Sequence, residues 1–587
     1  MTVTTTSYVR AGTLDELRRK GCIVVAGQGE TIALFMDGEK VYAVDNRCPH
    51  MGFPLSKGSV RNGILTCHWH HARFDLASGG TFDPFADDVR VFPVHVEDGI
   101  LWVDPQGAPK DWKAYWRGRL ADGLEQDLNL IIVKAILSLL DQGVAPGEIL
   151  GIGADFGTRY RADGWGPGLT IMTAMANILP SLGGEDQILA LYHGLSHVSD
   201  NTVGRAPRFD LDPLPAGPDG AIVPLDRLKT WLRGFIEVRD ADGAERCLRT
   251  ALAHGATAAD VSDMLMAAAT DHAYIDVGHP VDFINKAFEL LELIGWSKAD
   301  AVLPSLISGI ARARRSEESN AWRHPIDLIE LVDNALAAAP YEAPAGHWMG
   351  LDALADVLLD DNPSAALDAL NQALGEGASY VDLSQAVAYA AALRVARFHT
   401  ANEFGDWDTV LHTFTYANAV DQSMRRAPSW DLLRGVYHGA MSVYLDRFLN
   451  TPPARLPDER SVRDLPTDAD VLLDQLLSLL DRQQQVNQAG AVAYRYLSLS
   501  HPPARLLATL GHALLREDTL FHTYQVLEAG YRQYGILAES RPDLAPNVLV
   551  GVARYVAAHC PTARAMLQTA NIAMRLHRGE DLTVDIG

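Results

Sequence analysis

The chain has 587 residues and a formal net charge of −24, with 48% hydrophobic and 21% charged residues. This length is typical of about three to four domains, and the composition is typical of a folded globular protein. The acidic balance argues against nucleic-acid binding, because phosphate contacts require clustered Lys and Arg. No apolar run reaches the roughly 18 residues of a membrane span. We therefore expect neither nucleic acid nor a membrane as a partner.

The cysteine content points to a reducing compartment. Of the five cysteines, Cys22, Cys247 and Cys560 are isolated along the chain and are expected to be small buried side chains. The first residues lack the basic segment and apolar run of a secretory signal. We therefore expect a cytoplasmic protein without a disulfide framework.

Short apolar runs separated by turn residues fill the N-terminal part of the chain. Runs at 22–25, 31–35 and 40–44 are followed by two more at 89–96 and 100–103. Asp37-Gly38 and Asp98-Gly99 are hairpin signals between neighbouring runs. Residues 1–108 are thus predicted to form a small all-β domain, and residues 104–109, at its end, are predicted to be a linker.

Two short segments of this predicted domain carry metal-ligand side chains. Cys48-Pro49-His50 and Cys67-His68-Trp69-His70 form the pattern C-x-H-x16-C-x2-H. A [2Fe-2S] cluster with two cysteines on one iron and two histidines on the other needs this set of ligands. The alternative is a Cys2His2 zinc site. Zinc sites favour paired C-x2-4-C and H-x3-5-H segments, whereas each segment here supplies one residue of each kind.

The segments CPHMGFPLSKG and CHWHHARFD resemble the two cluster loops of Rieske ferredoxin domains, and the resemblance covers residues 1 to about 108. It implies that Cys48 and Cys67 hold an inner iron and that His50 and His70 hold an outer, more exposed iron. Rieske domains of respiratory complexes carry an additional disulfide between the loops. Neither loop here has a spare cysteine, so the domain resembles the ferredoxin and oxygenase type, with a reduction potential at the low end of the Rieske range.

Two histidines of the second segment depart from the family pattern. His71 stands where the family usually has a small residue, and His68 replaces a common proline. We expect both to be neighbours of the cluster and not ligands.

The sequence pattern changes from residue 112 onward, where apolar residues recur every three or four positions and Ala and Leu are the most frequent residues. Amphipathic helices are predicted at 126–142, 187–198, 225–238, 281–294 and 381–398. The fold class is therefore multidomain, with a small all-β Rieske domain followed by a large all-α body.

The helical body contains related segments, which predict two helical halves at 112–338 and 345–587 with a joint at 341–346. The paired positions are His193 with His438, His254 with His512, and His272 with His522. Shorter units at 252–269 and 374–391 resemble repeats of the carboxymuconolactone decarboxylase and AhpD superfamily, although the AhpD C-x2-C motif is absent. The spacing of histidines around 278–280 resembles questin-oxidase-like proteins.

Several histidines of the body are candidate ligands for iron or haem. His193 and His197 are spaced i, i+4 and share one helix face, and imidazole suits iron. His272 with His279, and His412 beyond the acidic and aromatic segment 397–408, form further groups. The predicted second site comprises His193, His197, His272, His438 and His522. The alternative is that these imidazoles are hydrogen-bonded packing residues.

A Rieske cluster moves single electrons and performs no bond chemistry itself, so the body must hold or dock the electron acceptor. We expect an iron-dependent oxidoreductase that receives electrons from a reductase or ferredoxin. It would pass them to an O2-activating metal site acting on a small molecule, as a monooxygenase does. The alternative is an electron-transfer ferredoxin whose helical scaffold docks a partner enzyme. The usual β-rich catalytic domain of Rieske oxygenases is not expected in this helical sequence.

Overall fold

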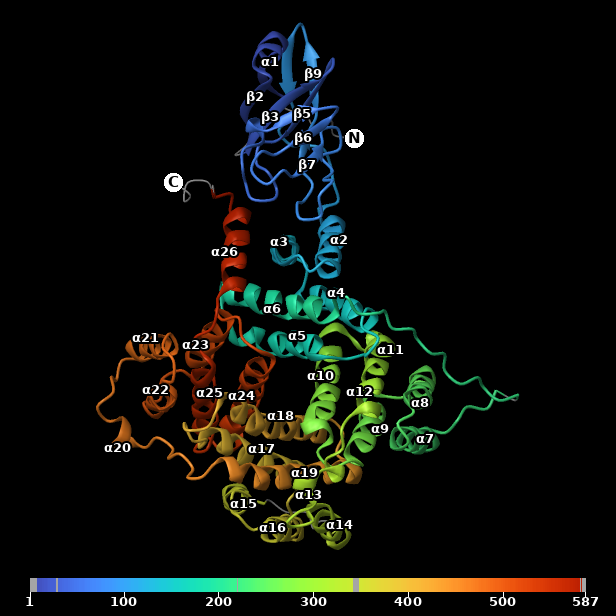
Figure 1. The fold of residues 1–587 in the computed structure, drawn as a ribbon, viewed down its shortest axis with the longest axis vertical. Coiled ribbons are helices and arrows are strands. Elements are labelled where there is room, and N and C mark those ends of the chain that lie inside the picture. The colour runs from blue at the N-terminus through green and yellow to red at the C-terminus, as the bar shows by residue number, and fades with distance from the viewer. Residues whose placement is uncertain (1–7, 28–29, 219, 341–347, 581, 583–587) are drawn as a thin grey trace. The chain divides into compact units, whose positions relative to one another are not determined.

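The structure is a computed structural model and describes residues 8–27, 30–218, 220–340, 348–580 and 582. The first residues, from which the lack of a secretory signal was argued, and the predicted joint at 341–346 lie outside the described residues. The chain forms two compact units, one of residues 1–152 and 568–587 and the other of residues 153–567 (Figure 1). Each is described by itself.

The first unit contains three small antiparallel sheets with strand orders β1-β10-β9, β2-β3-β4-β8 and β5-β6-β7. The strands are β1 (Val9–Thr13), β2 (Cys22–Gly27), β3 (Glu30–Asp37), β4 (Lys40–Asp45), β5 (Ser59–Arg61), β6 (Ile64–Thr66), β7 (Arg73–Asp75), β8 (Val91–Phe92), β9 (Val94–Glu97) and β10 (Ile100–Val103). The predicted all-β domain is therefore confirmed. Its helices are α1 (Leu14–Lys20), α2 (Trp112–Glu125) and α3 (Asn129–Asp141), and α26 (Ala565–His577) enters this unit from the C-terminal side.

Strand β3 is buried on both faces. Its side chains alternate, so that Ala33 and Phe35 enter one apolar core while Ile32 and Leu34 enter another. The predicted hairpin is confirmed: Asp37 pairs with Lys40 across a two-residue turn whose Gly38 has a φ of +60°. A sheet covered on both faces provides a rigid base for the loop that follows β4, whereas the loop after β6 extends from the separate sheet β5-β6-β7.

The second unit is helical. Its helices up to residue 338 are α4 (Pro146–Arg159, which begins in the first unit), α5 (Pro167–Ile178), α6 (Gly184–Thr202), α7 (Leu225–Glu237), α8 (Ala241–Ala253), α9 (Ala258–Thr270), α10 (His279–Ile294), α11 (Ala299–Val302), α12 (Ile307–Arg312), α13 (Asn320–Arg323) and α14 (Leu328–Ala338). Those that follow are α15 (Leu351–Leu358), α16 (Pro363–Gly375), α17 (Tyr380–Ala396), α18 (Phe404–Arg426), α19 (Trp430–Leu445), α20 (Glu459–Val462), α21 (Ala469–Leu480), α22 (Val486–Ser498), α23 (Pro503–Leu515), α24 (Phe521–Ser540) and α25 (Ala545–His559). The large helical body is confirmed, and helices lie at all five predicted segments, although the one predicted at 126–142 is α3 of the first unit.

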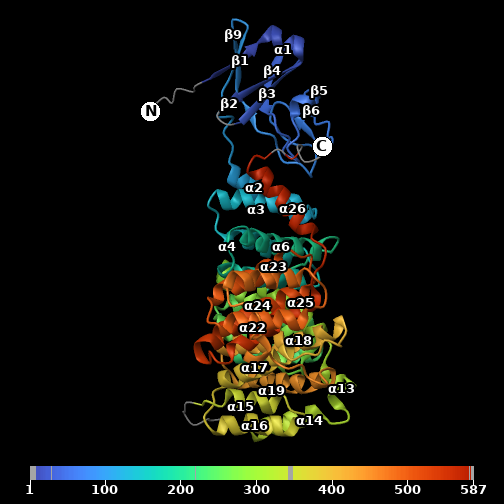
Figure 2. The same cartoon turned by 90° about the vertical axis from the view of Figure 1, so that its left-hand side faces the viewer.

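Helices from both predicted halves share one interior. Helices α17, α18, α24 and α25 pack together in the middle of the unit, and α10 packs on α18 while α5 packs on α24 (Figure 2). The relation between halves 112–338 and 345–587 stays a prediction. Among the described residues, no helix combines the length and apolar character needed to cross a bilayer.

A buried ion-pair network joins α10 to α24. Lys286 is 1% exposed and donates from Nζ to Glu289 at 2.8 Å and to Glu528 at 2.6 Å. Asn177 donates to both carboxylates, at 2.7 Å and 3.0 Å. Burial alone would lower the pKa of Lys286, but the two carboxylates raise it well above its ordinary value. The ammonium therefore stays charged inside the core.

Replacement of Lys286 by methionine is expected to destabilise the helical unit by about 3–5 kcal/mol, because two buried carboxylates would lose their counter-charge. Denaturant unfolding followed by far-UV circular dichroism measures this loss as a lower midpoint. The control is Lys298→Met, which breaks the exposed pair with Asp155 and should change stability by less than about 1 kcal/mol. Equal effects of the two substitutions would contradict the interpretation.

Candidate functional site

The two predicted cluster loops are tight turns that end strands. The first follows β4 and is closed by Cys48 N–H donating to the Phe53 carbonyl at 2.9 Å, with Gly52 at φ +81°. The second joins β6 to β7 and is closed by Cys67 N–H donating to the Ala72 carbonyl at 2.9 Å. Each loop thus begins with a cysteine whose backbone is held by a hydrogen bond across the turn.

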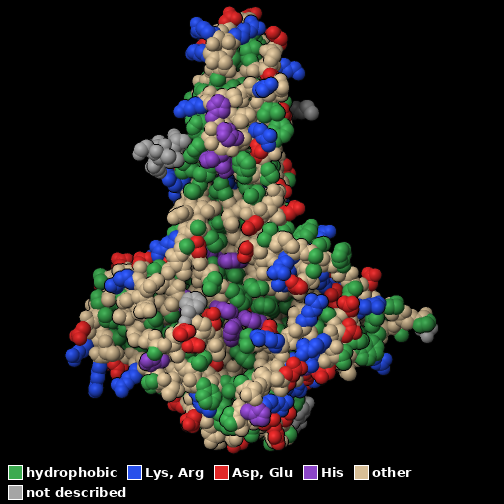
Figure 3. All heavy atoms as spheres, viewed as in Figure 1, with side chains coloured by type: hydrophobic (Ala, Val, Ile, Leu, Met, Phe, Trp, Pro, Cys, Tyr) green, Lys and Arg blue, Asp and Glu red, His purple; other side chains and the backbone are tan. Residues whose placement is uncertain are grey.

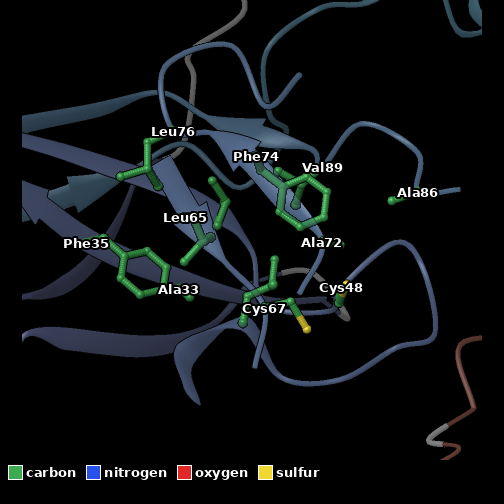
Figure 4. Close-up of a cluster of buried hydrophobic side chains, with 12 residues drawn as sticks. Ala33, Phe35, Cys48, Leu65, Cys67, Ala72, Phe74, Leu76, Ala86 and Val89 are labelled. Atoms are coloured by element: carbon green, nitrogen blue, oxygen red, sulfur yellow. The ribbon is translucent and has the colours of Figure 1, made fainter. Parts of the chain in front are cut away.

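The two sulfur atoms meet at the edge of the apolar core. Cys48 is 3% exposed and Cys67 is 1% exposed, and their thiols are hydrogen-bonded to each other (Figure 4). The hydrogen bond from Cys48 lowers the pKa of Cys67 to about 6 against the opposing effect of burial, and the same contact raises the pKa of Cys48. Backbone N–H groups of both loops also point at the sulfurs. The contact thus favours loss of the proton from Cys67, and metal binding requires cysteine in the thiolate form.

The two imidazoles lie farther out. His50 is half-buried and His70 is exposed, with their ring centroids 4.8 Å apart and their planes at 79°. Burial, followed by the neighbouring charges of His70 and Lys134, lowers the pKa of His50 to about 4. The buried Nδ1 of His50 has no hydrogen-bond partner among the described residues. Buried sulfurs with a neutral imidazole that lacks a partner fit a cluster with mixed ligands.

The other two histidines of the second loop turn elsewhere. His68 Nε2 lies 3.0 Å from the Ser59 hydroxyl, and His71 adopts a left-handed conformation with a φ of +61°. Exposed histidine side chains are visible on this face of the β domain (Figure 3). These positions are consistent with the expectation that neither His68 nor His71 is a ligand.

The N-terminal β domain is similar to known proteins. Residues 7–93 match the family model for the Rieske [2Fe-2S] domain. The chain is 30% identical over 95 residues to the ferredoxin component of the naphthalene 1,2-dioxygenase/salicylate 5-hydroxylase systems of a Ralstonia species. The match covers 91% of that protein and 16% of this chain. The chain belongs to the Rieske [2Fe-2S] family.

Two further relatives match within the same domain. The anthranilate 1,2-dioxygenase ferredoxin subunit of Burkholderia cepacia is 33% identical over 95 residues, which are 87% of that protein and 16% of this chain. The 4beta-methylsterol monooxygenase of Methylococcus capsulatus is 37% identical over 89 residues. That match spans only 24% of the monooxygenase and 13% of this chain. These similarities establish the Rieske domain, which implies a [2Fe-2S] cluster.

A buried charge network holds the first loop of the Rieske domain. Lys134 of α3 donates from Nζ to the Pro49 carbonyl at 2.5 Å and also pairs with Asp87. Arg119 of α2 donates to the second oxygen of Asp87 at 3.1 Å and to the Pro84 carbonyl at 2.8 Å. Arg119 also pairs with Asp122 at 2.9 Å, so Lys134 is the cation of this network that directly contacts the loop of Cys48 and His50.

Substitution of Lys134 by glutamine is expected to lower the midpoint potential of the cluster by on the order of tens of millivolts. The reason is that a nearby positive charge favours the reduced, more negative cluster. A redox titration followed by electron paramagnetic resonance (EPR) measures the shift. Lys20→Gln, which removes an exposed lysine paired with Glu16, is the matched control and should leave the potential unchanged. An unchanged potential in the Lys134 variant would show that this charge does not act on the cluster.

A second group of metal-ligand side chains lies within the helical unit. His279 opens α10, His412 lies in α18 and His522 lies in α24, and one ligand atom from each lies within 4.8 Å of the others. His412 Nε2 is 2.9 Å from His522 Nε2. The rings of His279 and His522 are stacked at 12°, and the His412 ring is nearly perpendicular to both. Three imidazoles therefore converge from three separate helices.

The protonation of this cluster suits metal binding. Burial and then the neighbouring histidines lower the pKa of His412 to about 3, and burial followed by His522 lowers that of His279 to about 4. His522 Nδ1 lies 3.3 Å from an oxygen of Asp408, which also accepts a 2.6 Å hydrogen bond from the Tyr555 hydroxyl. A carboxylate on the outer ring nitrogen keeps the proton there and directs the lone pair of Nε2 inward, as in many metal sites.

A cavity of about 420 Å³ adjoins the three-histidine cluster, and His412 is part of its wall. Most of the wall is apolar, with Trp322, Leu445 and Phe448 among the lining residues. Asp446 also lines the cavity, is 4% exposed, and has one carboxylate oxygen without a hydrogen-bond partner among the described residues. An apolar cavity with few polar groups is typical of a small-molecule site.

The structure brings one of the five predicted second-site histidines into this cluster, namely His522. His193 and His197 both contact the Tyr524 hydroxyl, at 2.6 Å and 3.1 Å. His272 Nδ1 is 2.8 Å from Glu317. His438 is buried beside Trp322, with ring centroids 6.2 Å apart. The prediction from sequence placed His279 and His412 in two separate groups and did not combine them with His522.

Proposed function

We propose that the protein is a Rieske oxidoreductase in which Cys48 and Cys67 hold the inner iron and His50 and His70 hold the outer iron. The support is the pair of buried sulfurs, the adjacent imidazoles and the family match of residues 7–93. The cluster would supply single electrons received from a reductase or ferredoxin. Exposure of the His70 imidazole is suited to electron exchange with such a partner.

We further propose that His279, His412 and His522 hold a single iron ion in the helical body. The observation that carries this proposal is the convergence of three imidazoles, two of them kept neutral by burial, at the wall of a cavity. Bound iron would supply O2 activation, and three protein ligands leave coordination positions open for O2 and solvent. This set replaces the predicted group of His193, His197, His272 and His438.

The reaction class that fits is monooxygenation of a small organic substrate. Insertion of one oxygen atom of O2 into a C–H bond, with the other atom leaving as water, consumes two electrons and two protons. The Rieske cluster would deliver the electrons one at a time. The apolar wall around Trp322 and Phe448 would hold the substrate and exclude water, and the free oxygen of Asp446 would hydrogen-bond a polar group on it.

Asp446 gives this cavity a pH dependence. Burial raises the pKa of Asp446 to about 7, although Thr413 and Arg394 oppose the shift. A raised pKa means that folding favours the protonated acid, so its stabilising effect is present below pH about 4 and is lost as the pH rises towards 7. Asp446→Asn should therefore be more stable than the unaltered protein above pH 7, by up to about 4 kcal/mol. Thermal unfolding from pH 4 to 8 tests this, and parallel curves for the two proteins would refute it.

The alternative is an electron-transfer protein whose helical body docks a partner enzyme. Two of the relatives favour this alternative, because they are described as the ferredoxin component or ferredoxin subunit of a dioxygenase system and not as the oxygenase. On this alternative the three imidazoles are packing residues that hydrogen-bond one another. None of the five cysteines forms a disulfide, which supports our proposal of a cytoplasmic location for either function.

Metal analysis separates the two functions. We expect the protein, purified from cells grown with iron, to carry three iron atoms per chain, two in the cluster and one in the helical body. The third iron should be removable by a chelator that leaves the cluster absorbance intact. Two iron atoms per chain, with none gained on anaerobic incubation with ferrous iron, would support the docking function.

A further inference from the structure

Arg554 is a buried cation that has no acidic partner among the residues that the structure describes. It lies in α25, is 2% exposed, and donates to the Asn487 side-chain oxygen at 2.5 Å and to the Phe398 carbonyl at 2.7 Å. Its Nε has no partner among the described residues. Burial lowers the pKa of Arg554 to about 10, with no carboxylate acting in the opposite direction.

The other buried arginines among the described residues have a carboxylate close by. Arg119 pairs with Asp87, Arg249 pairs with Glu245, and Arg516 lies 3.0 Å from Asp481. Arg394 makes no ion pair with a described residue, but the charge of Asp446 opposes the effect of burial on its pKa. A buried charge without a partner costs several kcal/mol, because the interior cannot replace its hydration. The exception at Arg554 therefore indicates that the missing negative charge comes from outside the chain.

Arg554 lines a cavity of about 470 Å³ that is separate from the three-histidine cavity and shares no lining residue with it. Arg455, His399 and Ser461 add donors, and no acidic side chain lines the cavity. The rest of the wall is largely apolar and includes three prolines of the segment 452–457. The cavity thus combines a cationic end with apolar sides.

We propose that this cavity binds a small organic carboxylate. The anionic group would accept hydrogen bonds from Arg554, whose planar guanidinium matches the two oxygens of a carboxylate. The apolar body of the ligand would lie along the proline-rich wall. A single buried cation favours a monoanion over a phosphate dianion. The proposal is independent of the metal in the helical body.

The test uses the full-length protein with its cluster and two probes, benzoate and hexanoate. Isothermal titration calorimetry should give saturable binding with a dissociation constant on the order of 1 mM or tighter. The same probes should raise the thermal unfolding midpoint, whereas benzyl alcohol, which lacks the charge, should not. Inorganic phosphate at equal ionic strength should bind at least tenfold more weakly than benzoate.

Two variants locate the binding. Arg554→Met should abolish the calorimetric signal and should unfold no earlier than the unaltered protein when no probe is present, because an uncompensated buried charge has been removed. Arg455→Gln, at an exposed lining position, should weaken benzoate binding severalfold without affecting the fold. If Arg554→Met does not fold, the Arg455 variant decides the matter. The proposal is overturned if neither probe binds, if phosphate binds as tightly, or if the folded variants bind as the unaltered protein does.

Discussion

Replacement of Cys67 by serine is expected to yield a colourless protein that lacks the EPR signal of a reduced Rieske cluster. Cys67 is 1% exposed and is hydrogen-bonded to Cys48, so its sulfur would face the proposed inner iron from within the core. A serine hydroxyl is nearly isosteric, but its far higher pKa keeps it protonated and makes it a poor ligand where thiolate is required. Iron content should fall by about two atoms per chain.

The control for this loss is Cys22→Ser. Cys22 is only partly buried in β2, and burial raises the pKa of its thiol to about 11, so it remains a protonated packing residue. That variant should keep the full visible absorbance and the same potential. A Cys67→Ser protein that retained its colour and iron would contradict the ligand assignment, as would a Cys22→Ser protein that lost them. The Rieske fold itself should survive, because Cys67 is only one of the twelve buried residues of this apolar core.

The Rieske loops could be predicted from the sequence because each is a local feature. Cys48 and His50 lie within one turn, as do Cys67 and His70, so the spacing along the chain already reports the geometry. The hairpin at Asp37 was predicted for the same reason, since the turn type depends on two adjacent residues. Helix positions in the body followed from apolar periodicity over a few turns.

The three-histidine cluster could not be predicted in this way. Its members come from α10, α18 and α24, and His412 and His522 are separated by 110 residues, so only the packing of the helices brings them together. The i, i+4 spacing of His193 and His197 is a local signal and pointed elsewhere. In the fold that pair meets the Tyr524 hydroxyl, which lies in the same helix as His522. An i, i+4 spacing shows that two side chains lie on the same side of a helix, but it does not show which residue of another helix they contact.

One part of the sequence did indicate the region of the three-histidine cluster. The acidic and aromatic segment 397–408 was singled out together with His412, and it contains Asp408, the carboxylate that contacts His522. A carboxylate four residues before a histidine on a helix is a weak signal, because most such pairs are exposed. Here Asp408 is not exposed, and its carboxylate is held by His522 and by the Tyr555 hydroxyl. These two contacts keep the pKa of Asp408 below its ordinary value, although burial acts in the opposite direction.

Substitution of His412 by alanine is expected to remove the third iron and at least a thousandfold of any oxygenase turnover, while the Rieske cluster keeps its spectrum and potential. His412 belongs both to the three-histidine cluster and to the cavity wall. Its loss would leave two histidine ligands, which are too few to hold the ion. An activation barrier raised by about 4 kcal/mol corresponds to a thousandfold slower reaction. Iron analysis measures the loss of the third iron, and the kinetics of cluster reduction show whether the Rieske cluster is unchanged.

The matched control is His193→Gln, which alters a buried histidine of the site predicted from sequence alone. His193 Nδ1 contacts the Tyr524 hydroxyl, and glutamine can still offer a hydrogen bond there, so this variant should keep three iron atoms per chain. Loss of the third iron from His193→Gln and its retention in His412→Ala would move the metal to the site predicted from the sequence. Loss in neither variant would indicate that the third iron binds elsewhere. Loss in His412→Ala alone, with the cluster still reducible, would locate the ion at the junction of α10, α18 and α24.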